Sequence, residues 1–116
     1  MVKLENHLGI IEISENFFSN LVGNAASRCF GVAGMASSQG KLVSFLNKNS
    51  NQPNKAVRIR YTGDELNIDL HIIVDNGVNL TTLGESIISR VRYEVNKYTG
   101  TQVRDVNVYI DSMMIG

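Results

Sequence analysis

The segment 56–74 reads AVRIRYTGDELNIDLHIIV and decides the fold, because two alternating apolar and polar runs flank the turn sequence Thr62-Gly63-Asp64-Glu65. Alternation around a Gly-Asp pair predicts an antiparallel hairpin. A two-residue loop then fixes a register in which every cross-strand pair on one face is apolar: Tyr61 with Leu66, Ile59 with Ile68, and Val57 with Leu70.

The other face of this hairpin is polar. The same register places Arg60 opposite Asn67 and Arg58 opposite Asp69. We expect the second pair to form a cross-strand charge pair that contributes roughly 0.2 to 1 kcal/mol. A slip of one residue would set apolar against polar positions throughout, so the register is well specified.

The segment that follows has the pattern of a helix and then a strand. A helical apolar stripe runs from the turn 75–77 to Gly100, with Thr81 as the expected cap, and residues 105–111 alternate. A strand, a helix and a strand in this order favour a right-handed parallel crossover. The residues of the stripe are Leu80, Leu83, Ile87, Ile88, Val91, Val95 and Tyr98.

The first half of the chain predicts further elements. Residues 8–13 form an apolar, β-branched run that ends at Ser14, a good N-cap. Helical spacing continues to Gly31, the expected stop. Residues 31–36 are apolar and flanked by chain-breaking residues, which favours a buried strand even though the segment contains two glycines. Residues 40–48 fit a short helix, and 47–55 is a polar loop that holds the one proline. The helical stripe contains Phe17, Phe18, Leu21, Val22, Ala25, Ala26 and Cys29.

The predicted order is strand, helix, strand, short helix, two strands, helix, strand. It indicates an α/β fold of the two-layer α+β sandwich type, with a mixed sheet of about five strands and two main helices on one face. A length of 116 residues suits a single domain, 1–116. A domain of this size buries enough apolar surface to fold without disulfides or a structural metal.

Composition argues against several classes of function. Eleven basic and eleven acidic residues cancel, so the chain has no overall positive field for nucleic acid or anionic lipid. The single cysteine, Cys29, lies on the predicted apolar helix face and reads as a small buried hydrophobe in a reducing compartment. The N-terminus lacks a signal-peptide pattern, and no apolar run reaches the length of a membrane helix. These features predict a cytoplasmic protein without direct membrane insertion.

Several separated motifs resemble the alkaline shock protein family, including its short YloU-like members from Gram-positive bacteria. The resemblance covers nearly the whole chain. It departs from the family at Asn76, where tyrosine is common, and at Thr81, where proline is common. Its carriers are Gly9-Ile10-Ile11-Glu12-Ile13-Ser14, Ala25-Ala26, Gly31-Val32-Ala33-Gly34-Met35, Asp69-Leu70-His71-Ile72-Ile73-Val74, Thr99-Gly100, Val103 and Val106-Asn107-Val108.

This resemblance implies a self-associating cytoplasmic protein of the cell-envelope or general stress response. It also implies a partner that anchors the protein at the membrane, or a lipid-kinase partner, since some short members are encoded near a fatty-acid kinase. It supplies no catalytic, metal-binding or cofactor-binding residue, and the prediction for each is none. We therefore predict a non-enzymatic interaction or scaffold protein that acts as an oligomer.

A KH-like nucleic-acid-binding module is the second hypothesis, because Gly31-Val32-Ala33-Gly34 follows a helix with the spacing of the KH glycine loop. Its middle residues are apolar, which favours the strand and makes nucleic acid the weaker alternative. Catalysis has less support still, since Ser14, Ser19 and Ser27 have no base arranged near them, and two histidines without ligand spacing make a poor metal site.

The second face of the sheet is the remaining place for function. It is polar and mixed in sign, and we expect it either to be plainly solvated or to form a self-complementary interface across a twofold axis. The predicted contact residues are Arg58, Arg60, Asp69, His71 and Tyr109.

Overall fold

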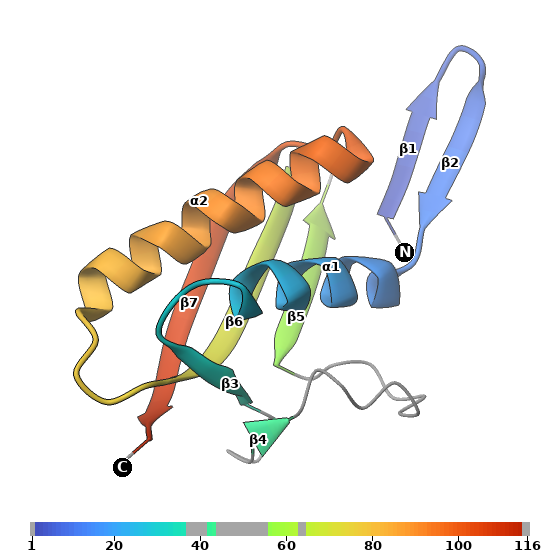
Figure 1. Ribbon diagram of the computed structural model, residues 1–116. Helices are drawn as coiled ribbons and strands as arrows, with labels where there is room; N and C mark the ends of the chain where they lie inside the picture. The colour runs from blue at the N-terminus through green and yellow to red at the C-terminus, as the bar shows by residue number, and fades with distance from the viewer. Residues whose placement is uncertain (1, 37–41, 44–55, 63–64, 115–116) are drawn as a thin grey trace.

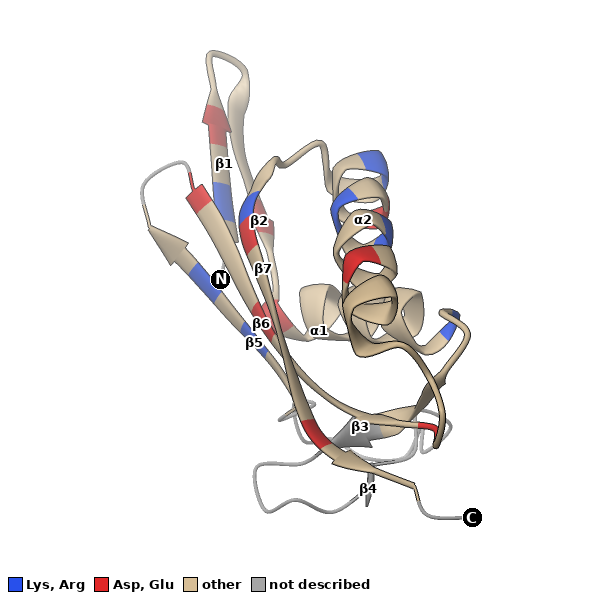
Figure 2. Cartoon of the chain, turned by 90° about the vertical axis from the view of Figure 1, so that its left-hand side faces the viewer, with Lys and Arg blue, Asp and Glu red and all other residues tan. Residues whose placement is uncertain are grey.

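The computed structural model describes residues 2–36, 42–43, 56–62 and 65–114. In this part of the chain two helices cover one face of a five-stranded mixed sheet, and a separate two-stranded hairpin projects from the body (Figure 1). Figure 2 shows the two layers, with the long strands on one side and both helices on the other. This arrangement confirms the predicted α/β two-layer sandwich.

The predicted central hairpin is formed by β5 (Val57–Thr62) and β6 (Glu65–Val74). Its register is confirmed at every predicted pair, because one face is apolar along its whole length and any slip would expose it. Leu66, Ile68 and Leu70 are completely buried on that face. The observed pairs are Val57 with Leu70, Arg58 with Asp69, Ile59 with Ile68, Arg60 with Asn67, and Tyr61 with Leu66.

Strand β6 is the centre of the sheet. Strand β7 (Val103–Met113) follows it along one edge, and the pairing is parallel, as the predicted crossover requires. Strands β5 and β3 (Val32–Ala36) therefore share the opposite edge, with β5 beside 65–70 and β3 beside 72–74. The predicted strand at 31–36 is thus confirmed.

Strand β4 (Leu42–Val43) pairs with the end of β3 and joins the sheet. The predicted short helix over 40–48 is therefore wrong at these two residues. A short apolar run fits either helix or strand, and pairing with β3 decides between them. The predicted polar loop, 47–55, lies outside the described residues.

Helix α2 (Leu80–Thr99) connects β6 to β7 and packs its predicted stripe on the sheet. Leu83, Ile87, Val91 and Val95 are buried, whereas Leu80 and Tyr98 at the ends of the stripe are exposed. The predicted cap at Thr81 is wrong. The N-cap is Asn79, two residues before Thr81, and its side chain accepts from the Thr82 N–H at 3.0 Å. Gly100 ends the helix as predicted, with a φ of 73° that favours glycine.

Helix α1 (Glu15–Ser27) begins at the predicted cap, where the Ser14 hydroxyl accepts from the Phe17 N–H at 3.1 Å. Its buried face is the one the sequence indicates and includes Phe18, Val22 and Ala26. The helix ends before the predicted stop, so Cys29 lies beyond its C-terminus and is half-buried against the core.

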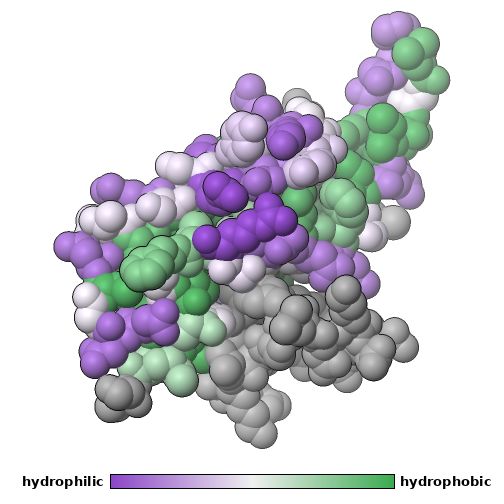
Figure 3. All heavy atoms as spheres, viewed as in Figure 1, coloured by the Kyte–Doolittle hydropathy of each residue, from purple (hydrophilic) through white to green (hydrophobic). Residues whose placement is uncertain are grey.

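The projecting hairpin consists of β1 (Val2–Asn6) and β2 (Gly9–Ile13). The strand predicted at 8–13 is confirmed, but it stays outside the main sheet and pairs with β1, a strand that was not predicted. The Asn6 side chain closes the turn by accepting from the Leu8 N–H at 2.7 Å. We call this element the arm, and Figure 3 shows apolar side chains exposed along it.

Candidate interaction surface

The face of β5, β6 and β7 that points away from both helices carries a dense set of polar and charged groups. Alternation along the strands aims these side chains to one side, because their apolar neighbours fill the core on the other. We call this surface the charged face. It contains Arg58, Arg60, Glu65, Asn67, Asp69, His71, Arg104, Asp105, Asn107, Tyr109 and Asp111.

All five predicted contact residues lie on the charged face. Arg58 and Arg60 come from β5, and Tyr109 comes from β7. Asp69 and His71 lie between them on β6. The structure thus brings the five together, and their role in binding stays a prediction.

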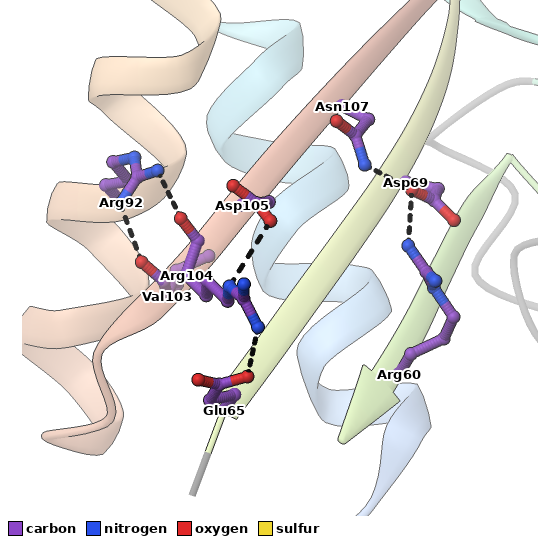
Figure 4. A network of polar contacts seen from close by, with 8 residues as sticks. All are labelled: Arg60, Glu65, Asp69, Arg92, Val103, Arg104, Asp105 and Asn107. Carbon is purple, nitrogen blue, oxygen red and sulfur yellow. Dashed lines mark hydrogen bonds and ion pairs between the residues drawn. The ribbon is translucent and has the colours of Figure 1, made fainter. Parts of the chain in front are cut away.

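The centre of the charged face is a chain of three side chains, one from each strand (Figure 4). Arg60 donates to the Asp69 carboxylate at 3.2 Å, and the Asn107 amide donates to the same oxygen at 2.9 Å. The predicted ion pair between Arg58 and Asp69 is therefore wrong, although these residues are opposite as expected. A long arginine side chain reaches its diagonal neighbour across the twisted strands, and Arg60 takes the carboxylate.

A second group ties the ends of β6 and β7 together. The His71 ring stacks on the Tyr109 ring with centroids 4.8 Å apart and planes 16° apart. Its Nδ1 lies 3.0 Å from one Asp111 carboxylate oxygen and 3.2 Å from the other. Asp111 thus orients the His71 ring, and Tyr109 stacks on that ring.

A third group at the start of the two strands was not among the predicted contact residues. Arg104 donates to Glu65 and lies 3.7 Å from Asp105 (Figure 4). The hydrogen bond and the charge of Glu65 raise the pKa of Arg104, so it stays cationic. The register shifts between 103 and 105, and this irregularity breaks the alternation that would have placed Arg104 from the sequence.

Strand β7 is also tied to the helical layer. Arg92 of α2 donates to the main-chain carbonyls of Val103 and Arg104, each at 2.6 Å (Figure 4). A planar guanidinium can serve two acceptors at once, so one side chain satisfies both carbonyls at the irregular start of the strand.

The residues weighed for catalysis have structural roles in the described part of the chain. The Ser14 hydroxyl caps α1, Ser19 is buried, and Ser27 donates to the Asn24 carbonyl at 2.9 Å. Burial raises the pKa of the Cys29 thiol, which makes it a weaker nucleophile at neutral pH. Among the described residues no group of three or more His, Cys, Asp or Glu side chains is placed to hold a metal ion.

The segment that suggested a KH glycine loop has a different structure. Val32 and Gly34 belong to β3, and both pair with β6 inside the sheet. Gly31 precedes the strand with a φ of 103°, and its main-chain carbonyl accepts from the Asp75 N–H at 2.8 Å. A paired strand does not present the row of free amides that clamps a nucleic-acid backbone.

Neither helix of the described residues has the length and apolar character needed to cross a membrane.

Fold and surface together define a small two-layer α/β domain whose sheet has one packed face and one charged face. Solved structures share this fold. The copper form of the MamM CTD matches with a TM-score of 0.52 and 22% identity, over 88% of this chain and 89% of that one. The zinc form of MamM CTD D249N also matches at 0.52, with 21% identity over 87% and 88%. At this level of identity the likeness shows the fold alone.

The chain belongs to the alkaline shock protein 23 family, a family with a cell envelope-related function, whose model matches residues 3–115. This confirms the family indicated by the sequence motifs. Uncharacterized protein YloU of Bacillus subtilis (strain 168) is 30% identical over 117 residues, covering 98% of this chain and 96% of that protein. Uncharacterized protein Spy1614 of Streptococcus pyogenes serotype M6 is 28% identical, covering 98% and 95%.

Proposed function

We propose that this chain is a non-catalytic interaction module with a role at the cell envelope, and that it acts by self-association and partner binding through the charged face. The protein would be cytoplasmic and would reach the membrane through a partner. A membrane-anchoring protein and a lipid kinase are the partner classes that the family resemblance suggests.

The observation that carries this proposal is the contrast between the two faces of one sheet. The helices bury the apolar face, while the charged face keeps its groups in solvent and holds many of them in fixed positions by contacts between neighbouring strands. Side chains that are already ordered lose less conformational entropy on binding. Such a surface is therefore suited to recognition.

Size-exclusion chromatography with light scattering, over a range of protein concentrations, tests the self-association. We expect the wild-type chain to be larger than a monomer at micromolar concentration and to dissociate as salt rises, because exposed charges are screened. A chain that stays monomeric at high micromolar concentration and low salt would contradict self-association.

A charge reversal tests the surface. We expect Arg58→Glu to shift the wild-type oligomer toward monomer, because it inverts an exposed charge on β5. Lys97→Glu is the matched control, since it inverts a charge on the exposed side of α2. Equal effects of the two variants would show that the charged face is not the contact surface.

A further inference from the structure

The charges of the charged face are distributed unevenly across the sheet. Strand β5 contributes two cations, Arg58 and Arg60, and no acidic side chain. Strand β7 contributes two anions, Asp105 and Asp111, against one cation, Arg104, so its charge on this face is net negative. Figure 2 shows blue residues along β5, red residues along β6, and red residues on β7 with a blue stretch at its start. The face therefore runs from basic to acidic across the central strand.

The cations of β5 and the anions of β7 also lie at matching positions along the strand direction. Arg60 pairs with Asn67 from one edge of β6, and Asp105 pairs with the same Asn67 from the other edge. A cation and an anion thus lie at equal height on opposite sides of β6. Both stay available, because the Arg60 side chain is 52% exposed and that of Asp105 is 58% exposed despite their contacts within the chain.

This layout selects one way of stacking two copies of the sheet. A twofold axis between the sheets and parallel to β6 lays β5 of one copy over β7 of the other and preserves height along the strands. Arg60 of each copy then faces Asp105 of its partner. An axis that runs across the strands would instead lay β5 over β5 and bring its arginines together, with no acidic side chain on that strand to offset them. The parallel axis also lays β6 over β6, but there the Asp69 carboxylate is paired with Arg60 and that of Glu65 with Arg104.

The separation suits the side chains as well. Stacked sheets lie about 10 Å apart, a distance that an arginine and an aspartate extended toward each other can span. We infer that a second copy of this chain docks on the charged face about a twofold axis parallel to β6, with two symmetric contacts between Arg60 and Asp105. The inference rests on the proposed self-association and assigns its geometry.

Charge exchange tests this arrangement. In Arg60→Asp and in Asp105→Arg the two contacts become repulsive, so we expect each variant to weaken dimerisation by more than about tenfold. The double variant Arg60→Asp/Asp105→Arg restores opposite charges at both contacts and should dimerise within a few-fold of wild type. Analytical ultracentrifugation at low salt measures the dimer dissociation constants of wild type and of the three variants, and circular dichroism checks that each variant is folded.

Mixing the two single variants gives a sharper result. In a heterodimer of Arg60→Asp with Asp105→Arg, the new aspartate faces the new arginine and the two native residues face each other. We therefore expect the mixture to dimerise although neither variant does so alone. Damage to the fold would not be repaired by mixing, so rescue would be specific to the pairing.

Other outcomes separate this inference from the proposed function. If wild type dimerises and both charge reversals leave the dissociation constant unchanged, the twofold arrangement is wrong while self-association stands, and the interface lies elsewhere on the chain. If wild type is a monomer, both fail. Should the reversals unfold the chain, Arg60→Gln and Asp105→Asn replace them, and unchanged affinity in both neutral variants would overturn the arrangement.

Discussion

The arm and the β5–β6 hairpin are both antiparallel, but their surroundings are opposite. In the β5–β6 hairpin one face is buried under α1 and α2, and its central apolar side chains are inaccessible to solvent. In the arm, Leu8 is 85% exposed, Ile10 57% and Ile11 55%. An isolated two-stranded hairpin is marginally stable in water. The first hairpin is thus part of the core, and the second depends on contacts at its base.

The arm has a defined position because apolar side chains at its base pack on the core. Val2 is buried, and its neighbours Leu4 and Ile13 pack against the core from the same end of the hairpin. Farther out, Ile11 is opposite Leu4 on one side of the arm, while Ile10 is opposite Glu5 on the other. Apolar residues on both sides leave the arm without one buried face. What covers a hairpin therefore matters to its stability as much as its turn does.

The largest difference between the hairpins should appear on truncation of one isoleucine in each. Ile68→Ala removes buried methyl groups from β6 and should lower the free energy of unfolding by about 2–5 kcal/mol. Ile11→Ala is the matched change in the arm and should alter it by less than about 0.5 kcal/mol. Urea denaturation measures both values. A loss in Ile11→Ala as large as that in Ile68→Ala would show that the arm belongs to the cooperative core.

A smaller difference should appear between two cross-strand ion pairs. Arg60 and Asp69 lie 3.2 Å apart in the charged face, and Lys3 and Glu12 lie 3.9 Å apart in the arm. A double-mutant cycle to alanine should give a coupling energy of about 0.5 kcal/mol for the first pair. We expect no measurable coupling energy for the second pair, because its contact is longer and the Glu12 side chain is far more exposed than that of Asp69. Equal coupling energies would remove this distinction.

The smallest effect concerns Cys29, which lies in the body between α1 and β3. Burial raises its thiol pKa, so the thiolate fraction at mildly alkaline pH is below that of an unfolded chain. Alkylation should therefore be slower in the native protein, and unchanged by Ile11→Ala. The folded state also holds this proton more tightly, so its contribution to stability is present below the ordinary thiol pKa and declines as pH rises through the folded value. An alkylation rate equal to that of the unfolded chain would contradict the burial.

Prediction from sequence succeeds where one face of an element is buried throughout. The period-two pattern of β5 and β6 determined the pairing to the residue, and the stripe of α2 identified its packed side, because a shift in either would expose apolar surface. The polar side of the sheet follows from the same alternation, so the five predicted contact residues could be assigned to one face before the structure was known.

The differences arise where tertiary contacts decide between local alternatives. Strand β1 has a short alternating pattern of its own, but nothing in it says that β2 will pair there and leave the main sheet. Leu42 and Val43 fit a helix until β3 provides a strand to pair with. Arg60 takes Asp69 because of side-chain reach across a twisted sheet, which register alone does not reveal. The Arg104 group depends on an irregularity in β7 for the same reason.

The parallel pairing of β6 with β7 has a consequence for the order in which the chain is made. Strand β6 obtains its neighbours on one edge from β3 and β5, which precede it in the chain, but its other edge is filled only by residues 103–113. Until those residues leave the ribosome, a strand with a fully apolar face has an open edge, the kind of surface on which nascent chains aggregate. A chain that stalls before residue 103 would therefore expose the open edge of β6 to other chains.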